Sequence, residues 1–430
     1  MNTAIIFGLL AALMLTGMPV SISLGLTVLS FLFFMTQVPI ESVALKLFTG
    51  IEKFEIMAIP FFILAGNFLT HGGVAKRMIH FATSLVGHWP GGLGLGAVVA
   101  CALFAAVSGS SPATVVAIGS ILIPAMIKAG YPVKFGAGVV ASAGGLGILI
   151  PPSIVMVMYA VSTNSSIGAL FMAGVIPGLV LAAMLMLTTW YRAWKYNYPK
   201  EKRASWGERV KAFRESVWGL FLIVVVMGGI YSGIFTPTEA AAMSAVYAFF
   251  VAVFVYKDMG LKDVPKTLLA SANMSAMLLY IITNAVLFSF LLTHENIPQA
   301  ISEWLLASGL GVIGFLLAVN ILLLLMGNFM EPSSIILITA PILFPIAMKL
   351  GIDPVHFGVM ITVNMEIGMI TPPVGLNLYV ASGISKLGLT DMTKAVWPWL
   401  LTMLVFLAIV TYWPPLSLWL PRQLGMISGG

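Results

Sequence analysis

Long apolar runs alternate with short polar or charged segments along the whole chain. A helix needs about 20 apolar residues to cross the hydrocarbon core of a bilayer, and several runs approach that length. They predict spans over residues 56–70, 168–190, 217–235, 240–256, 267–292 and 395–420, and one long span over 4–35, kinked at Gly17-Met18-Pro19. Because a lipid core leaves no partner for free backbone groups, helices are expected throughout. The pattern predicts an all-α polytopic membrane protein.

Two apolar segments are interrupted near their centres by a polar sequence. Residues 91–128 carry Ser108-Gly109-Ser110-Ser111-Pro112 between two arms, and residues 309–350 carry Gly327-Asn328-Phe329-Met330-Glu331-Pro332. The arms of the first segment, 93–107 and 113–127, are about 15 residues each, too short to span a bilayer. We interpret both segments as re-entrant helical hairpins that enter and leave on one side, with their polar tips buried midway.

Each hairpin is followed by a span that is itself interrupted. Residues 134–162 contain Gly144-Gly145-Leu146-Gly147 and then Pro151-Pro152, and residues 356–384 contain Pro372-Pro373. A single break of this kind can be a kink relieved by neighbouring helices. Two breaks per half, paired with polar hairpin tips, favour a binding site instead.

The two halves of the chain repeat each other. Residues 121–126 match 342–348 around Pro124 and Pro345, and residues 147–152 match 368–373 at the same offset. A weaker match relates residues 68–71 and 292–294, which share Leu-Thr-His. We expect a first repeat over 4–195 and a second over 238–420 in opposite orientation, with 217–235 as the extra span that inverts it.

Composition supports the membrane interpretation. Hydrophobic residues make up 60% of the chain and charged residues only 8%, against about 25% in soluble domains. The net charge of +6 lies in loops and is not a nucleic-acid signal. The single Cys101 excludes an internal disulfide. The N-terminal residues lack a basic region before the apolar run, so we interpret them as a retained span rather than a signal peptide.

The most charged stretch, residues 192–215, sets the expected orientation. Its excess of Lys and Arg predicts a cytoplasmic loop. Counting spans from it places the N-terminus in the cytoplasm, the C-terminus in the periplasm, and residues 236–239 and 294–296 outside. The first hairpin then opens to the cytoplasm and the second to the periplasm. Residues 39–55 combine charges with apolar residues at helical spacing, which predicts an amphipathic helix in the interface.

These elements predict a transport part held in a scaffold. We assign residues 91–162 and 309–384, the hairpins and broken helices, to the transport domain. Residues 1–90, 163–308 with the basic arm 192–215, and 385–430 are assigned to the scaffold.

The interrupted helices leave backbone carbonyls without partners, and these carbonyls suit a weakly held hard cation such as Na⁺. Ser110 or Ser111 before Pro112, and Glu331 before Pro332, look like helix starts with proline near the first position. Helix N-termini favour anions, so we expect a carboxylate substrate beside the cations.

Glu331 and Glu366 are acids at membrane depth, where an ionisable residue is a functional candidate. Glu366 is expected at a proton or cation site, or as a structural partner of a tip amide. The amides of Asn328, Asn364 and Asn377 either bind substrate or satisfy freed backbone groups. His71 and His294 are expected at span ends, where a structural role is commoner. The sequence contains no phosphate loop, metal-ligand cluster or nucleophile triad.

These motifs resemble the large, DctM-like membrane subunit of tripartite ATP-independent periplasmic (TRAP) transporters. The resemblance covers essentially the whole chain and rests on SGSSPAT at 108–114, GGLGILIPPS at 144–153, EPSS at 331–334 and GMITPPVGLN at 368–377. It implies an elevator-type transporter in the bacterial inner membrane, with Na⁺-driven symport of an organic acid and no organic cofactor. It also implies a periplasmic binding protein (DctP-like) and a separate small membrane subunit (DctQ-like), because the chain begins at the first span of the large subunit.

The resemblance also implies which residues bind. A first Na⁺ site would use Ser108, Ser111, Gly144, Gly147 and Pro151, and a second Gly327, Gly368, Thr371 and Pro372. Glu366 is a further candidate cation ligand from its depth alone. Substrate would contact Ser108, Ser110, Ser153 and Glu331, joined by Asn328 and Asn377. Relatives that transport sialic acid pair an acid with a cation near the second hairpin. Here only His294 is near Glu331 for that role, which favours a C4-dicarboxylate.

Three other functions remain open from the residues. A stand-alone Na⁺/dicarboxylate symporter would share the architecture without needing a binding protein. An intramembrane enzyme would need a catalytic pair, and neither His nor Cys accompanies the two acids. A channel would need a continuous pore, whereas tips that meet midway favour alternating access.

Overall fold

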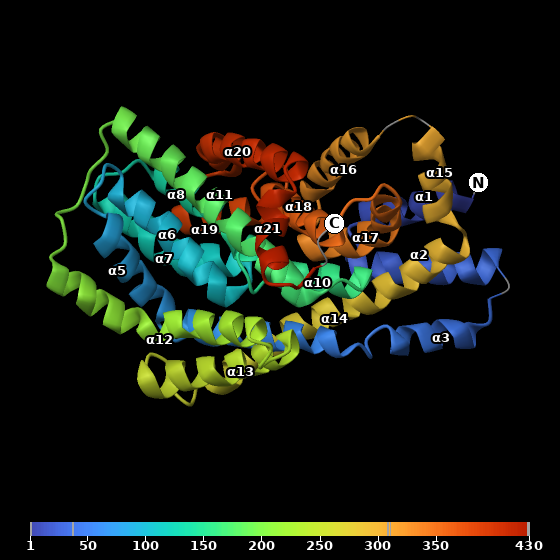
Figure 1. Cartoon of the computed structure of the whole chain (residues 1–430), viewed down its shortest axis with the longest axis horizontal. Helices are drawn as coiled ribbons and strands as arrows, with labels where there is room; N and C mark the ends of the chain where they lie inside the picture. Colours follow the sequence, from blue (N-terminus) through green and yellow to red (C-terminus); the bar gives the residue numbers. More distant parts are fainter. Residues whose placement is uncertain (1, 37, 308, 310, 428–430) are drawn as a thin grey trace.

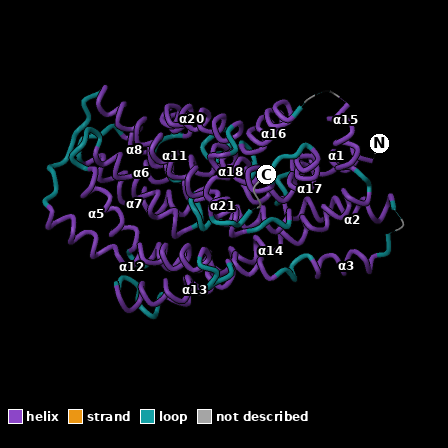
Figure 2. The backbone as a smooth tube through the Cα atoms, in the orientation of Figure 1, coloured by secondary structure: helices purple, strands orange, loops and turns teal. Residues whose placement is uncertain are grey.

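The chain folds almost entirely into helices in a computed structural model that describes residues 2–36, 38–307, 309 and 311–427. Within these residues no strand occurs, as Figure 2 shows. Nine helices in the described part are long and apolar enough to cross a membrane. The all-α polytopic prediction is confirmed. The predicted second hairpin begins at residue 309 and includes residue 310, which lies outside the described residues.

The predicted single span over 4–35 is wrong. The structure has two helices there, α1 (Asn2–Leu15) and α2 (Val20–Met35), which contact each other. Gly17, with φ of 84°, adopts the left-handed conformation that ends a helix, and Pro19 precedes the next one. At 14 and 16 residues, each helix is shorter than a full span.

An amphipathic helix is present in the predicted region 39–55 as α3 (Ile40–Thr49), followed by a short 3₁₀ turn, η1 (Phe54–Met57). The predicted span 56–70 is α4 (Ala58–His71). A second amphipathic helix, α5 (Val74–Val86), was not predicted, because its charged residues read as a loop. It buries its apolar face against the first hairpin.

The first predicted hairpin is two helices packed side by side, α6 (Gly92–Ser108) and α7 (Ser111–Lys128). The broken span after it consists of α8 (Val133–Ala143), the single turn α9 (Leu146–Leu149) and α10 (Ile154–Thr163). The breaks fall at the predicted glycines and at the Pro151-Pro152 pair. The helix breaks in this half therefore fall where the sequence predicted them.

The charged stretch 192–215, predicted as a loop, is partly helical. It comprises the end of α11 (Ile167–Lys195), a short connection, and the start of α12 (Trp206–Tyr231). Ser205 caps α12 in a reciprocal capping box with Glu208. Likewise the predicted turn at 236–239 is the capped first turn of the next helix, where Thr236 and Glu239 form the same box. Both errors arose because charged and polar residues at the ends of helices were interpreted as loops.

The second half mirrors the first. Helix α13 (Pro237–Phe250) continues into the π-helical turn η2 (Val251–Val255), and α14 (Val264–His294) is followed by the short helix α15 (Ile297–Ala307), which was not predicted. The second hairpin is α16 (Val312–Gly327) and α17 (Pro332–Lys349), and the second broken helix is α18 (Pro354–Gly368) and α19 (Leu376–Ser385). Helices α20 (Leu389–Tyr412) and α21 (Pro415–Gln423) end the fold.

The two hairpins have their open ends at opposite ends of α20. Near the start of α20, Asp391 pairs with Lys134 at 2.7 Å, just after the first hairpin. At its far end, the Tyr412 hydroxyl donates to the carbonyl of Ile313, where the second hairpin begins. A 24-residue helix rises about 36 Å, so the two entrances are far apart. This arrangement is what an inverted repeat requires.

The connections at the first hairpin's open end also lie beside the basic stretch. The backbone N–H of Glu201 donates to the carbonyl of Gly87, and the Tyr131 hydroxyl donates to the carbonyl of Pro199. The first hairpin therefore opens on the side that carries residues 196–205, as the sequence predicted.

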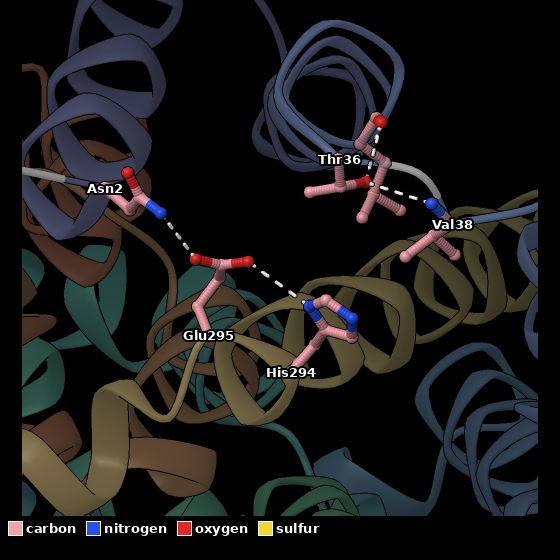
Figure 3. Close-up of polar contacts among 6 residues, drawn as sticks. Asn2, Thr36, Val38, His294 and Glu295 are labelled. Atoms are coloured by element: carbon pink, nitrogen blue, oxygen red, sulfur yellow. Dashed lines mark hydrogen bonds and ion pairs between the residues drawn. The ribbon is translucent and has the colours of Figure 1, made fainter.

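The N-terminus lies beside the turn between α14 and α15 (Figure 1). Asn2 Nδ2 donates to Glu295 Oε2 at 2.8 Å, and Figure 3 shows this contact with His294 on the other side of the same carboxylate. The sequence interpretation placed the N-terminus inside and residues 294–296 outside, and those two placements cannot both hold. Because α1 and α2 replace one span with two short helices, the N-terminus is at the same end as Glu295.

Candidate functional site

Both hairpin tips end at the start of a helix. Ser110 is the N-cap residue of α7, with Pro112 in its first turn, and Glu331 is the N-cap residue of α17, with Pro332 following. Neither side chain caps the backbone of its own helix. The first N–H groups of these helices are therefore oriented toward the tips, where they favour negative charge.

A backbone hydrogen bond ties each tip to the broken helix of its own repeat. The N–H of Ile154, after Pro151-Pro152, donates to the carbonyl of Gly109 at 3.3 Å. In the second repeat, the N–H of Val374, after Pro372-Pro373, donates to the carbonyl of Asn328 at 3.0 Å. The tips and the interrupted segments thus form equivalent units in both halves.

Glycines allow the tips to approach the broken helices closely. A Cβ atom on Gly147 would lie 2.6 Å from the carbonyl oxygen of Ser110. In the second repeat, a Cβ on Gly368 would lie 2.8 Å from the Cα of Gly327. Real Cβ contacts are longer than this, so larger residues at either position would displace backbone. Gly147 and Gly368 occupy matching places in the repeat.

Asn377 and Glu366 of the second repeat both contact the first repeat. Asn377, at the start of α19, donates from Nδ2 to Ser111 Oγ at 2.7 Å and to the carbonyl of Ala141 at 3.2 Å. Glu366 on α18 lies against Gly145, where a Cβ would be 2.4 Å from its Cγ. The second broken helix therefore packs on both the first tip and the first broken helix.

A cavity of about 450 Å³ lies where the two tips meet the rest of the fold. It is lined by both hairpin tips, by both broken helices and by two outer helices, α4 and α14. The tips contribute Ser108–Ala113 and Val116, and Glu331–Ser333; the broken helices contribute Ile148, Ile154, Val155, Met369 and Leu376; the outer helices contribute Ile63, Gly66, Asn67, Thr70, His71, Met274, Met277 and Leu278.

Four of the predicted binding residues line this cavity: Ser108, Ser110, Ser111 and Glu331. The Ser108 hydroxyl lies 2.9 Å from Thr114 Oγ1, and Ser334 Oγ donates to Glu331 Oε1 at 3.3 Å. Ser153 lies outside the lining, because its hydroxyl caps α10 and donates to the carbonyl of Ile148 at 2.6 Å. Asn328 and Asn377 also lie behind the lining, at the contacts described above.

The residues predicted to bind cations surround the two tips. Gly144, Gly147 and Pro151 lie on the first broken helix, and Gly327, Gly368, Thr371 and Pro372 lie at the second tip and its broken helix. Thr371 donates from Oγ1 to the carbonyl of Ile367 at 2.7 Å. The atoms that these residues can offer to a cation are backbone carbonyl and hydroxyl oxygens. Oxygen ligands suit a hard cation such as Na⁺.

Several buried oxygens near these positions have no hydrogen-bond partner among the described residues. They are both carboxylate oxygens of Glu366 and the side-chain carbonyl oxygens of Asn328 and Asn377. Burying a polar group without a partner is costly, and burying a carboxylate costs far more. Within the described part of the chain, no group of three His, Cys, Asp or Glu side chains comes together as a transition-metal site.

Sequence reasoning missed the contribution of the outer helices. Asn67, Thr70 and His71 line the cavity from α4, which packs against the first tip at Gly66, and Met274 and Met277 line it from α14. Asn67 Nδ2 donates to Ser271 Oγ at 2.8 Å, which fixes α4 against α14. The Leu-Thr-His sequence shared by the ends of these two helices indicated that they are equivalent in the repeat. It did not indicate that they line the cavity.

Residues 7–416 match the family model described as tripartite ATP-independent periplasmic transporter, DctM component. The chain belongs to this family. It is 72% identical to the C4-dicarboxylate TRAP transporter large permease protein DctM of Rhodobacter capsulatus, over 99% of this chain and 100% of that protein. It is 51% identical to the protein of the same name from Vibrio cholerae, over 99% of this chain and 98% of the relative. Both relatives are transporter permeases by name.

A solved structure has the same general fold. The YdaH transporter of Alcanivorax borkumensis matches with a TM-score of 0.62, covering 89% of both chains, at 16% sequence identity. At this sequence identity, the likeness supports the fold of this TRAP large subunit and says nothing about its function. Together with the apolar helices, family membership identifies a multi-pass inner-membrane protein.

Proposed function

We propose that this TRAP large subunit carries out Na⁺-coupled uptake of a C4-dicarboxylate by an elevator mechanism. The observation that carries the proposal is the cavity of about 450 Å³ in which both hairpin tips and both broken helices meet two outer helices. Sites at the junction of inverted repeats, built from interrupted helices, are the usual binding sites of secondary transporters.

The proposed substrate class follows from the partial positive charge of the helix N-termini at the two tips. Helices α7 and α17 both begin at the cavity, and their N-terminal N–H groups favour an anion. The hydroxyls of Ser108 and Ser110 add further donors. The two relatives named above are both C4-dicarboxylate permeases by name, which supports a small dicarboxylate over a sugar acid.

The cation coupling rests on the oxygens around the tips. The unpartnered carboxylate of Glu366 and the amide oxygens of Asn328 and Asn377 are buried behind the cavity. A bound Na⁺ would relieve their desolvation and offset the negative charge of substrate and Glu331. We assign one cation to the first tip with Ser108 and Ser111, and another to the second tip with Gly327 and Thr371.

The elevator mechanism is supported by how the helices group. Helices α11 and α20 pack mainly on the hairpins, the broken helices and each other, whereas α4 packs on α13 and α14. The sequence interpretation placed α11 and α20 in the scaffold. Their packing supports placing them instead with the body that moves, leaving α2, α4, α13 and α14 as the scaffold.

The family description as a tripartite system supports two partners. We propose that a small membrane subunit binds the scaffold and that a periplasmic binding protein delivers the substrate. The basic residues 196–205 favour a cytoplasmic face for the first hairpin's open end. The N-terminus and the turn after α14 then lie on the periplasmic side.

Uptake into proteoliposomes tests the proposal. The vesicles would contain this chain and its small subunit, and labelled succinate, malate and sialic acid would be compared with and without a Na⁺ gradient and a cognate binding protein. Succinate or malate uptake that needs both would support the proposal. Uptake of free substrate without a binding protein would overturn the tripartite part and favour a stand-alone symporter, and uptake independent of Na⁺ would overturn the coupling.

A further inference from the structure

The two outer helices that flank the cavity end alike. Helix α4 ends at Leu69-Thr70-His71 and helix α14 at Leu292-Thr293-His294, and each is followed by a short helix that leads to a hairpin. These short helices, α5 and α15, each pack on the hairpin of their own repeat. His71 and His294 are thus equivalent positions of the inverted repeat.

The two histidines lie at opposite ends of the scaffold. Asn67, one turn before His71, donates to Ser271 in the first third of α14, and Arg77, beyond His71, pairs with Asp258, just before α14 begins. Helices α4 and α14 therefore run antiparallel. From Ser271 to His294 the helix rises about 35 Å at 1.5 Å per residue. His71 therefore lies beside the beginning of α14 and His294 at its far end.

In this conformation only one of the pair reaches the cavity. His71 lines it, and its Nδ1 contacts the carbonyl oxygen of Asn67 at 2.8 Å. Because a carbonyl can only accept, Nδ1 carries a hydrogen, and in the imidazolium form Nε2 also carries one that it can donate to a carboxylate. Among the described residues that line the cavity, His71 is the only Lys, Arg or His.

His294 is engaged elsewhere. Its Nδ1 pairs with Glu295 Oε1 at 3.2 Å, and the other carboxylate oxygen accepts from Asn2 at 2.8 Å (Figure 3). This pairing holds the ring at the turn between α14 and α15, beside the N-terminus. One histidine of the pair is therefore available to a ligand, while its counterpart is bound within the protein.

We propose that His71 and His294 bind the substrate carboxylate in turn, one at each membrane face. The inference rests on the proposed function, because it needs an anionic substrate and a moving body. In this conformation the substrate leaves or enters past His71. When the hairpins move to the other end of the scaffold, the repeat symmetry places His294 where His71 is now, and its contact with Glu295 gives way to the substrate.

The required displacement is set by the scaffold helix. In this conformation the cavity lies beside Met274–Leu278 of α14. Asn67 lines it four residues before His71, and the residue four before His294 is Phe290, so the repeat symmetry places the cavity beside Phe290 in the other conformation. From Met277 to Phe290 the helix rises about 20 Å. The exchange of partners therefore needs a movement of the hairpin body along α14 rather than a local opening.

Exchange in proteoliposomes tests the proposal. The vesicles hold the complex with unlabelled succinate inside, and labelled succinate with the binding protein outside, so only complexes whose periplasmic face is outward are measured. The half-saturating succinate concentration is determined separately for the internal and the external face. The variants are His71→Gln, His71→Lys and His294→Gln, with His80→Gln as a matched control, because His80 is exposed on α5 and does not line the cavity.

Losing a charge-assisted hydrogen bond should raise the half-saturating concentration about tenfold or more. We expect His71→Gln to do so at the internal face alone and His294→Gln at the external face alone. His71→Lys should retain most of the affinity, and His80→Gln should change neither value.

Two results would overturn the inference: unchanged internal affinity in His71→Gln, or both variants acting on the same face. Absence of succinate exchange by the wild-type complex would overturn the proposed function and this inference with it. The wild-type measurement thus separates the two failures.

Discussion

Asn377 Nδ2 lies 2.7 Å from Ser111 Oγ, so a side chain of the second repeat holds the tip of the first hairpin. The same amide nitrogen reaches the carbonyl of Ala141 on the first broken helix. Asn377 follows the interrupted segment of the second repeat directly, two residues after Gly375. A change at either of the proposed cation sites can therefore affect the other through the side chain of Asn377.

Replacing Asn377 by leucine should weaken Na⁺ binding at the first tip. The leucine would leave Ser111 Oγ buried and without this partner, which costs about 1–3 kcal/mol. We expect the Na⁺ concentration for half-maximal uptake to rise several-fold, as measured by uptake across a series of Na⁺ gradients. Ser111→Ala should also raise it, because that variant removes a proposed ligand.

The double variant Asn377→Leu/Ser111→Ala tests whether Asn377 acts on Na⁺ binding through Ser111 or independently of it. If the pair acts as one unit, the double variant should shift the Na⁺ dependence little more than Ser111→Ala alone. Additive shifts would show that Asn377 acts on uptake by some other route.

Glu331→Gln should lower uptake while leaving the amount of protein in the membrane unchanged. The side chain lines the cavity at the start of α17 and accepts a hydrogen bond from Ser334. Removing its charge changes the field that the substrate and cations meet, so we expect at least about a tenfold loss in the ratio of maximal rate to half-saturating concentration. Labelled succinate uptake per mole of membrane-inserted protein measures this.

The control is Glu215→Gln, an exposed carboxylate on α12 away from the cavity. It should leave both uptake and membrane insertion unchanged. Equal uptake by Glu331→Gln and wild type would remove Glu331 from the binding site.

Much of the transport machinery could be predicted from the sequence because its signals are local. The polar tip Ser108–Pro112 between short apolar arms, and the paired prolines at 151–152 and 372–373, mark the breaks without knowledge of the fold. The repeat then relates the two halves. Ser108, Ser110, Ser111 and Glu331 were predicted to bind substrate or Na⁺ for the same reason, since they lie at the breaks themselves.

What could not be predicted depends on contacts between distant segments. Asn67 and His71 lie in an ordinary apolar span and reach the cavity only because α4 packs against the first tip at Gly66. Ser153 lies at a break, but its hydroxyl satisfies its own helix. One kinked span could not be distinguished from the pair α1 and α2, since the interruption at Gly17-Met18-Pro19 is compatible with both.

Glu201→Gln should stabilise the protein at neutral pH. Partial burial raises the pKa of the Glu201 carboxyl above its ordinary value, in the segment that joins α11 to α12. A group whose pKa is raised on folding contributes stability below its unfolded pKa, and this contribution is lost as pH rises through the folded pKa. The glutamine cannot ionise, so it escapes that loss.

The variant should therefore melt slightly higher than wild type at neutral pH, and the two should converge as pH falls toward the ordinary carboxyl pKa. Thermal unfolding of the purified protein in detergent across that pH range measures this. Glu52→Gln, on an exposed segment before η1, controls for the general loss of one negative charge. A difference that stays constant with pH would exclude ionisation of Glu201 as the cause.

Gly368→Ala should impair transport through backbone contact. A Cβ at this position would lie 2.8 Å from the Cα of Gly327 and 3.1 Å from its carbonyl oxygen, so the second tip would have to move away from its broken helix. Overpacking of this kind costs about 1–3 kcal/mol, and here the cost falls on the geometry of the proposed cation site. We expect the half-saturating Na⁺ concentration to rise and maximal uptake to fall.

Gly383→Ala is the matched control, because Gly383 lies on α19 in the same half and a Cβ there would meet nothing within 4 Å. Alanine is the better helix former by about 0.5–1 kcal/mol, so this variant should be as stable as wild type or more so and should transport normally. Uptake across a Na⁺ series for both variants decides the matter. Normal Na⁺ dependence in Gly368→Ala would mean that the close approach of Gly327 and Gly368 is not needed for cation binding.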